Sequence, residues 1–395
     1  MPNLISDIPA KRRFTVGMIG GGHGSFFAGI HRAAMRLTGC FDVKAGVFSS
    51  NEAVSREAAE ALGVIPERTY RTFRDMAEAE SIRSDKIDVA VVVTPNHLHY
   101  EPCRLFLEAG IPVICDKPLV NTSGEAEALI DLAEKTELFA AVTYTYTGYP
   151  MVRDARARVQ RGEIGEVKFL YVEYLLEWLA NDPSKLGKGG LWRGDPGKAG
   201  LTGALGDVGT HAFNILEFVS SKRCVALNAK LSTTVDGFGL DDTGVVQMEF
   251  EGGAEGLLWC SLAAPGHRNG LRFKIVGSKG TLEWRQEQPE TLHLSRMGQA
   301  DLIYRRGASD MTEEGASCVS LPAGNPEAYL EALAVLYMDY ASALEAGPNW
   351  RTIGKTPVTD LNEGLRGVLL SEICVRSSQT KMWQPFPKSR MWGDP

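Results

Sequence analysis

The stretch Phe14-Thr-Val-Gly-Met-Ile-Gly-Gly-Gly-His-Gly-Ser25 decides how this chain folds. Its first half is an apolar run typical of a buried strand, its second half is a glycine-rich turn, and Phe26 to Leu37 has helical character. Strand, glycine turn and helix in this order match the dinucleotide-binding pattern G-x-G-x-x-G/A, with Ser25 at the last small position. Glycines let the backbone approach a pyrophosphate, whose charge is stabilised at the helix N-terminus. We therefore expect a dinucleotide to contact Gly20, Gly22, His23, Gly24 and Ser25.

The next apolar run predicts the ribose site. Val43 to Phe48 reads as a strand and ends in Ser49-Ser50-Asn51. An acidic residue at this point would hold a ribose diol and favour NAD, but the sequence has none. Serine hydroxyls suit either a 2′-hydroxyl or a 2′-phosphate, and Arg56 reads as a phosphate ligand or as a solvated helix residue. The sequence thus predicts Ser49 and Ser50 as cofactor contacts and leaves NAD or NADP open.

Two further apolar runs end in polar residues. Ile87 to Val93 leads into Thr94-Pro-Asn-His-Leu-His99, and Ile111 to Cys115 leads into Asp116-Lys117-Pro118. Helices alternate with these strands, which predicts a doubly wound parallel sheet over residues 12–145, a Rossmann domain. Ligands bind beyond the carboxyl ends of such strands. We expect cofactor contacts from this edge at Thr94, Pro95, Asn96, His99, Asp116 and Lys117.

Lys117 is the candidate catalytic residue of this edge. A partly dehydrated lysine takes part in proton transfer when its ammonium form is destabilised. The alternative interpretation is a surface turn that carries a solvated ion pair with Asp116.

Composition excludes several classes of protein. The chain has 395 residues and a net charge of −7, without the basic run that nucleic acid binding requires. Neither a signal peptide nor a membrane-spanning segment is predicted, so we expect a cytoplasmic protein without a membrane partner. Its seven cysteines lack C-x-x-C spacing, and no cluster has the spacing of a metal site. We therefore expect reduced thiols and no metal.

The second half of the chain has a different pattern. Runs that alternate apolar and polar residues follow one another from Lys168 to Trp284 without helices between most of them. They predict an α+β domain over residues 146–380, built on a large, mostly antiparallel open sheet, followed by a tail at 381–395. The tail reads either as an arm that contacts a neighbouring subunit or as a disordered end. Between the strands, Trp192 and Arg193 suit a sugar-binding loop, with an ordered surface loop as the alternative.

At this point the sequence resembles the Gfo/Idh/MocA family, named after glucose–fructose oxidoreductase, inositol dehydrogenase and rhizopine catabolism. The resemblance rests on the glycine turn, on Thr94-Pro95-Asn96 with His99, on Asp116-Lys117-Pro118 in place of the commoner Glu-Lys-Pro, and on Gly203-Ala-Leu-Gly-Asp-Val-Gly-Thr-His211. It implies a nicotinamide cofactor and a homodimer or homotetramer formed through the outer face of the open sheet. One departure is the tyrosine-rich stretch Tyr144 to Tyr149, where many members of that family carry an Asn- or Arg-rich stretch.

Asp207 and His211 lie four residues apart and are expected on one face of a helix from Gly206 to Phe218. Alone, the pair reads as a helix-opening carboxylate and an ordinary core histidine. Together with Lys117 it predicts catalysis: His211 as general base, Asp207 orienting it or the substrate, and Lys117 stabilising the reacting oxygen. The predicted substrate contacts are Lys117, Tyr146, Trp192, Arg193, Asp207 and His211.

The prediction is an NAD(P)-dependent oxidoreductase that transfers a hydride between nicotinamide and a secondary hydroxyl or ketone of a sugar, sugar derivative or cyclitol. Two alternatives stay open. One is an enzyme that keeps NAD tightly bound and oxidises and reduces a glycoside within one cycle. The other is a nucleotide-binding regulator without catalysis, against which the complete set of candidate residues argues.

Overall fold

The computed structural model describes residues 12–180, 194–353 and 357–388. Contacts divide the chain into two compact units. The parallel-sheet unit holds residues 12–145 together with Leu330–Leu365, and the open-sheet unit holds Tyr146–Tyr329 together with the described residues 366–388. The chain therefore returns to its first unit late in the sequence.

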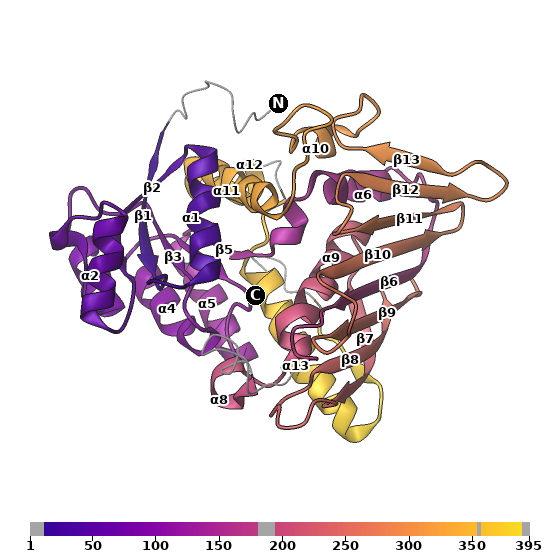
Figure 1. Ribbon diagram of the computed structural model, residues 1–395, viewed down its shortest axis with the longest axis horizontal. Coiled ribbons are helices and arrows are strands. Elements are labelled where there is room, and N and C mark those ends of the chain that lie inside the picture. Colours follow the sequence, from indigo (N-terminus) through magenta and orange to yellow (C-terminus); the bar gives the residue numbers. More distant parts are fainter. Residues whose placement is uncertain (1–11, 181–193, 354–356, 389–395) are drawn as a thin grey trace. The chain divides into compact units, whose positions relative to one another are not determined.

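The parallel-sheet unit is built on five strands in the order β2-β1-β3-β4-β5, each parallel to its neighbours (Figure 1). The strands are β1 (Phe14–Ile19), β2 (Phe41–Val47), β3 (Val89–Val92), β4 (Val113–Asp116) and β5 (Ala140–Thr143). The strand order reverses between β1 and β3, which is where ligands bind in such sheets. The predicted doubly wound sheet is confirmed.

Helices alternate with these strands, and three of the five begin at a residue whose side chain caps the helix. They are α1 (Phe26–Thr38), α2 (Glu52–Ala61), α3 (Phe73–Ser81), α4 (Tyr100–Glu108) and α5 (Ser123–Thr136), with short 3-10 turns η1 (Pro66–Arg68) and η2 (Asn96–Leu98). Thr122 and Glu125 form a capping box at α5, and Thr72 and Asp75 form another at α3. Each box satisfies backbone N–H groups that a helix start leaves without partners.

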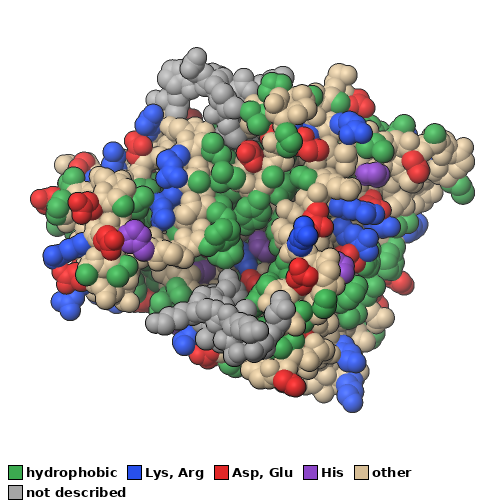
Figure 2. All heavy atoms as spheres, in the orientation of Figure 1, with side chains coloured by type: hydrophobic (Ala, Val, Ile, Leu, Met, Phe, Trp, Pro, Cys, Tyr) green, Lys and Arg blue, Asp and Glu red, His purple; other side chains and the backbone are tan. Residues whose placement is uncertain are grey.

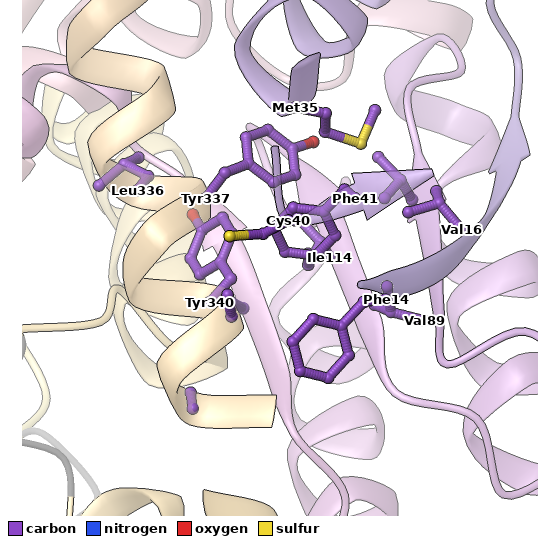
Figure 3. Packing of buried hydrophobic residues seen from close by; sticks show 14 of the residues in the cluster. Phe14, Val16, Met35, Cys40, Phe41, Val89, Ile114, Leu336, Tyr337 and Tyr340 are labelled. Carbon is purple, nitrogen blue, oxygen red and sulfur yellow. The ribbon is translucent and has the colours of Figure 1, made fainter. Parts of the chain in front are cut away.

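A late helix completes the core of this unit. It is α11 (Tyr329–Ala346), followed by η7 (Gly347–Asn349) and α12 (Trp350–Ile353). Figure 3 shows Tyr337 and Tyr340 of α11 turned toward the strands, beside residues of β1 and β2. The Tyr337 ring lies 5.2 Å from that of Phe41 in an edge-to-face contact. The sheet face under α11 is thus buried, as a parallel sheet requires on both faces.

The open-sheet unit contains a nine-stranded sheet in the order β13-β12-β11-β10-β6-β9-β8-β7-β14 (Figure 1). Its strands are antiparallel to their neighbours except for the parallel pair β6 and β9. They are β6 (Val167–Leu175), β7 (Cys224–Ser232), β8 (Thr243–Phe250), β9 (Ala254–Ser261), β10 (Gly270–Gly277), β11 (Gly280–Arg285), β12 (Thr291–Arg296), β13 (Leu302–Arg305) and β14 (Gln384–Pro385). The predicted large, mostly antiparallel sheet is confirmed.

Helices cover one face of this sheet. Those in contact with its strands are α6 (Pro150–Gln160), η6 (Leu205–Gly209) and α9 (Thr210–Ser220). The chain also forms η3 (Thr145–Gly148), α8 (Pro196–Ala199), α10 (Glu313–Ala316) and α13 (Leu361–Thr380). The alternation of buried and exposed residues along β8 shows that its other face is open. A buried ion pair between Arg366 of α13 and Glu217 of α9 joins two of these helices.

The helix predicted from Gly206 to Phe218 is not uniform. Its first turn, η6, is a π turn, and regular α-helix begins only at Thr210. Asp207 lies in the π turn and His211 in the first turn of α9. A single π turn inserted into a helix is frequent at functional sites.

The first part of the predicted tail is an edge strand. Residues Gln384–Pro385 form β14, which pairs with β7, and Phe386 is buried against Phe213 with ring centroids 5.4 Å apart. This segment therefore belongs to the open sheet. Trp392 lies outside the described residues.

The described surface carries charges of both signs. Basic and acidic side chains are interspersed over the face shown in Figure 2. Among the described residues, no helix is long and apolar enough to cross a membrane. All seven cysteines are buried free thiols.

Candidate active site

The glycine turn after β1 is shaped by close backbone contacts. At Gly20, which has φ +92°, an added Cβ would lie 2.9 Å from the carbonyl oxygen of Val93, at the end of β3. The Gly22 N–H donates to the Phe48 carbonyl at 2.7 Å, which ties the turn to the end of β2. Arg32 of α1 donates to the Gly21 carbonyl at 2.9 Å. The turn thus lies against both neighbouring strands at the point where the sheet order reverses.

The N-terminus of α1 fits an anion. Ser25 is its N-cap, without a side-chain capping bond, and the first turn carries no acidic residue. An added Cβ at Gly24 would meet nothing within 4 Å, so the space in front of this turn is open. The backbone N–H groups of such a helix start suit a pyrophosphate. The exposed His23 side chain lies 3.3 Å from Glu57 of α2.

The ribose end of the predicted site lies at the end of β2. The Ser49 hydroxyl accepts from the Asn51 N–H at 3.1 Å, and Asn51 in turn caps α2 through Val54. Ser50 is exposed beside them. Arg56 forms an ion pair with Glu52 one turn earlier in the same helix. Its charge is thus already matched by a carboxylate.

Asp116 is held inward by three elements of the unit. Its Oδ1 accepts from the Thr143 hydroxyl at 2.6 Å and from the Lys117 N–H at 2.9 Å. The buried His31 of α1 places Nε2 3.7 Å from the same oxygen, while its Nδ1 lies 2.7 Å from the Tyr337 hydroxyl. Burial alone would raise the pKa of Asp116, but His31, Thr143 and Lys117 together bring it well below its ordinary value. Asp116 is therefore a carboxylate, and its side chain fixes the backbone of the candidate catalytic residue Lys117, which is half-buried.

The segment Thr94 to His99 is anchored by its own histidine. The Thr94 hydroxyl donates to the Leu98 carbonyl at 3.1 Å and closes η2, which contains Asn96. His99 is 1% exposed, and its ring nitrogens face the carbonyl oxygens of Pro118 and Thr94, each at 2.8 Å. The sequence predicts His99 as a cofactor contact, but both of its ring nitrogens face backbone carbonyls instead.

In the open-sheet unit, His211 lies within a group of aromatic rings. Its ring is 5.0 Å from that of Tyr146, at 88°, and 6.3 Å from that of Tyr174 on β6. The Tyr146 hydroxyl shares a short hydrogen bond with the Tyr174 hydroxyl, which donates to Asn269 Oδ1 at 2.7 Å. Burial raises the pKa of Tyr174, and the nearby charge of Asp207 adds to this effect. The two tyrosines are therefore neutral phenols beside the candidate base.

The segment that leads into Asp207 is held in place by Asp241. The carboxylate of Asp241 accepts from the Gly203 N–H at 2.7 Å and from the Leu205 N–H at 2.9 Å. An added Cβ at Gly203 would lie 2.3 Å from the Asp241 carbonyl oxygen, so only glycine fits. Asp241 thereby fixes the start of the segment that carries Asp207 and His211.

The predicted residues fall into two groups, one in each unit. The glycine turn, Ser49, Ser50, Thr94 to Asn96, His99, Asp116 and Lys117 lie at the carboxyl edge of the parallel sheet, whereas Tyr146, Asp207 and His211 lie in the open-sheet unit. Trp192 and Arg193 lie outside the described residues. Sequence reasoning missed His31, Tyr174 and Asn269, and none of them belongs to a local motif. Among the described residues, no group of three or more potential ligands could hold a metal.

Comparison with known proteins agrees with this architecture. Residues 14–144 match the family described as "Oxidoreductase family, NAD-binding Rossmann fold", and residues 152–283 match the GFO/IDH/MocA C-terminal domain. The chain belongs to the Gfo/Idh/MocA oxidoreductase family. The predicted family and its NAD-binding domain are thereby confirmed.

Individual family members cover nearly the whole chain. The uncharacterized oxidoreductase YfiI of Bacillus subtilis is 33% identical over 93% of this chain and 96% of its own. An inositol dehydrogenase homolog from Azotobacter vinelandii, complexed with NAD+, has 32% identity and a TM-score of 0.92 over 95% of this chain and 98% of its own. Levoglucosan dehydrogenase of Pseudarthrobacter phenanthrenivorans is 27% identical over 95% of this chain and 99% of its own. The proteins similar to this oxidoreductase thus include a sugar dehydrogenase and an inositol dehydrogenase homolog.

Proposed function

We propose that this family member is an NAD(P)-dependent dehydrogenase that acts on a secondary hydroxyl of a sugar, a sugar derivative or a cyclitol. The observation that carries the proposal is the set of contacts that hold the Asp116 carboxylate. Its carboxylate is held by Thr143, His31 and the Lys117 N–H, so it fixes the lysine backbone at the ligand edge of the sheet. Relatives named for inositol and levoglucosan support the substrate class.

The proposed chemistry divides between the two units. In the oxidising direction, His211 removes the proton of the substrate hydroxyl as hydride leaves the adjacent carbon. Asp207 orients His211 or the substrate, and the Lys117 ammonium stabilises the alkoxide that develops on the reacting oxygen. Bound nicotinamide supplies the hydride acceptor.

A polyhydroxy substrate suits the polar groups near His211. Tyr146, Tyr174 and Asn269 form a chain of hydrogen bonds, and Asn269 is half-buried. Because Asn269 Oδ1 accepts from Tyr174, its amide nitrogen is left as a donor for a substrate hydroxyl. Such fixed polar groups favour a substrate with several hydroxyls over an apolar alcohol.

The site residues fit a dinucleotide, and its ribose end favours no single coenzyme. Ser49 and Ser50 offer hydroxyls, and the charge of Arg56 is matched by Glu52. We propose NAD or NADP as cofactor, held by the glycine turn, by these serines and by Thr94 to Asn96.

A panel of sugars and cyclitols, assayed with each coenzyme by the absorbance of the reduced nicotinamide, tests the proposal. We expect turnover with at least one polyol and none with simple alcohols of similar size. Loss of turnover in both Lys117→Ala and His211→Asn, with coenzyme binding retained, is the expected companion result. Unchanged kinetics in both variants would reject the assigned roles.

We also propose a homodimer or homotetramer formed through the open face of the nine-stranded sheet. Val245 and Trp259 are register partners on β8 and β9, and their side chains are 39% and 37% exposed. Light scattering of the purified chain tests this, with Trp259→Glu as the variant expected to dissociate the assembly. A monomeric wild-type protein would reject the proposal.

A further inference from the structure

His99 is surrounded by hydrogen-bond acceptors. Nδ1 lies 2.8 Å from the Pro118 carbonyl oxygen, and Nε2 lies 2.8 Å from the Thr94 carbonyl oxygen. The residue is 1% exposed, so water does not replace either contact. Both distances are those of ordinary N–H···O hydrogen bonds.

The two contacts determine which form of the ring fits. A carbonyl oxygen only accepts, so each ring nitrogen must carry a proton to make its bond. A neutral imidazole carries one proton and would turn a lone pair toward one of the two oxygens. Only the doubly protonated imidazolium satisfies both contacts.

No nearby charged group among the described residues accounts for a positive charge on the His99 ring. His99 precedes the first turn of α4, where the helix dipole disfavours positive charge. Glu101 in that turn is engaged by Arg104 and Arg74. The two carbonyl contacts are therefore the interactions on which a cation at this position depends.

The two carbonyls belong to the two loops at which the candidate site is built. Thr94 begins the segment after β3, and Pro118 directly follows Lys117 after β4. The ring thus joins these loops on one side of Lys117, while His31 holds Asp116 on the other. Histidines from two helices therefore contact the two sequence neighbours of Lys117: His31 of α1 contacts Asp116, and His99 at the start of α4 contacts Pro118.

We propose that His99 is a buried imidazolium that acts as a positioning residue for Lys117, and that its ring does not bind the coenzyme. The kinetic part of this inference rests on the role proposed for Lys117. The protonation state does not, because it follows from the two carbonyl contacts alone.

Nuclear magnetic resonance of the ¹⁵N-histidine-labelled full chain tests the protonation state. The spectrum is recorded at about pH 8, above the range in which an exposed imidazole titrates. His99→Gln identifies the His99 signals by their loss. We expect both ring nitrogens to carry slowly exchanging protons, and a nitrogen without a proton would overturn the inference.

Kinetics of two variants test the positioning role. His99→Gln keeps one donor for one carbonyl, whereas His99→Phe keeps the ring shape and neither donor. We expect kcat to fall about 10-fold in the first and about 100-fold in the second, since small displacements of a reacting group carry costs of this size. The Kd of the coenzyme, measured by fluorescence, should change less than about 3-fold, because the ring does not touch it.

The control is His293→Gln, at an exposed position on β12, which should behave as wild type. Loss of coenzyme affinity with kcat retained would show that His99 is a direct ligand and would overturn the proposal, as would unchanged kcat in both variants. If His99→Phe does not fold, the wild-type spectrum and His99→Gln still decide. An inactive wild type with a doubly protonated His99 would count against the proposed function while supporting the imidazolium.

Discussion

His31 Nε2 lies 3.7 Å from Asp116 Oδ1, and both groups are inside the parallel-sheet unit. On its other side, the imidazole contacts the hydroxyl of Tyr337, a residue 306 positions later in the chain. The residue that precedes the candidate catalytic lysine is therefore supported by a helix from the far end of the sequence. The Asp116 carboxylate is turned toward this support.

Asp116→Asn should change how stability depends on pH. The folded-state pKa of Asp116 is depressed, so its stabilising contribution is present above the ordinary value of about 4 and is lost as pH falls below it. We expect the variant to lose about 2 kcal/mol of unfolding free energy at pH 7, because hydrogen bonds to a charged group are removed. Urea unfolding should show a smaller difference from wild type near pH 3. The exposed Asp301→Asn serves as control, and a difference independent of pH would contradict the prediction.

Lys117→Ala should separate catalysis from coenzyme binding. Removing the ammonium leaves the developing alkoxide without its cation, so kcat should fall by roughly 10²- to 10⁴-fold. The coenzyme Kd should change far less, because the glycine turn stays intact. Lys168→Ala, at an exposed lysine on β6, is the matched control. A proportional loss of coenzyme binding would assign Lys117 to the cofactor instead.

Tyr174→Phe should alter substrate recognition. The variant loses the hydroxyl that donates to Asn269 Oδ1 at 2.7 Å and that bonds Tyr146, so the Asn269 amide is no longer held in one orientation. We expect KM for the polyol to rise roughly 5- to 20-fold, the size expected for one or two neutral hydrogen bonds, with the coenzyme KM unchanged. Tyr171→Phe on the same strand, whose hydroxyl donates to Glu173, is the control. An equal effect in both variants would refute the assignment.

Glu52→Gln should shift coenzyme preference toward NADP. The change removes the carboxylate that pairs with Arg56 and releases the guanidinium for a 2′-phosphate near Ser49 and Ser50. We expect the ratio of kcat/KM for NADP to that for NAD to rise about 3- to 10-fold, since exposed ion pairs contribute on the order of 1 kcal/mol. Glu52→Gln combined with Arg56→Ala should remove the gain. A ratio unaffected by either change would place the ribose site elsewhere.

Local patterns predicted much of the parallel-sheet unit. The order of strand, glycine turn and helix from Phe14 to Leu37 depends on neighbouring residues alone, and the buried runs that end at Thr94 and Asp116 follow the same rule. The alternation of apolar and polar residues along β8 likewise predicted a sheet with two different faces, and the structure buries only one of them. Where the prediction assumed a uniform helix, at Gly206 to Phe218, the structure has a π turn, which the apolar spacing does not reveal.

The sequence by itself determined the family, the Rossmann turn and the identity of Lys117, Asp207 and His211 as candidates, because each is encoded in a short stretch. Only the tertiary structure decided that His31, which contacts Tyr337, supports Asp116. It also decided that both ring nitrogens of His99 face carbonyl oxygens, and that the Tyr174 hydroxyl donates to Asn269. These contacts join residues up to 306 positions apart. Such pairs produce no recognisable pattern in the sequence, because the two residues come together only after the sheets and helices have packed.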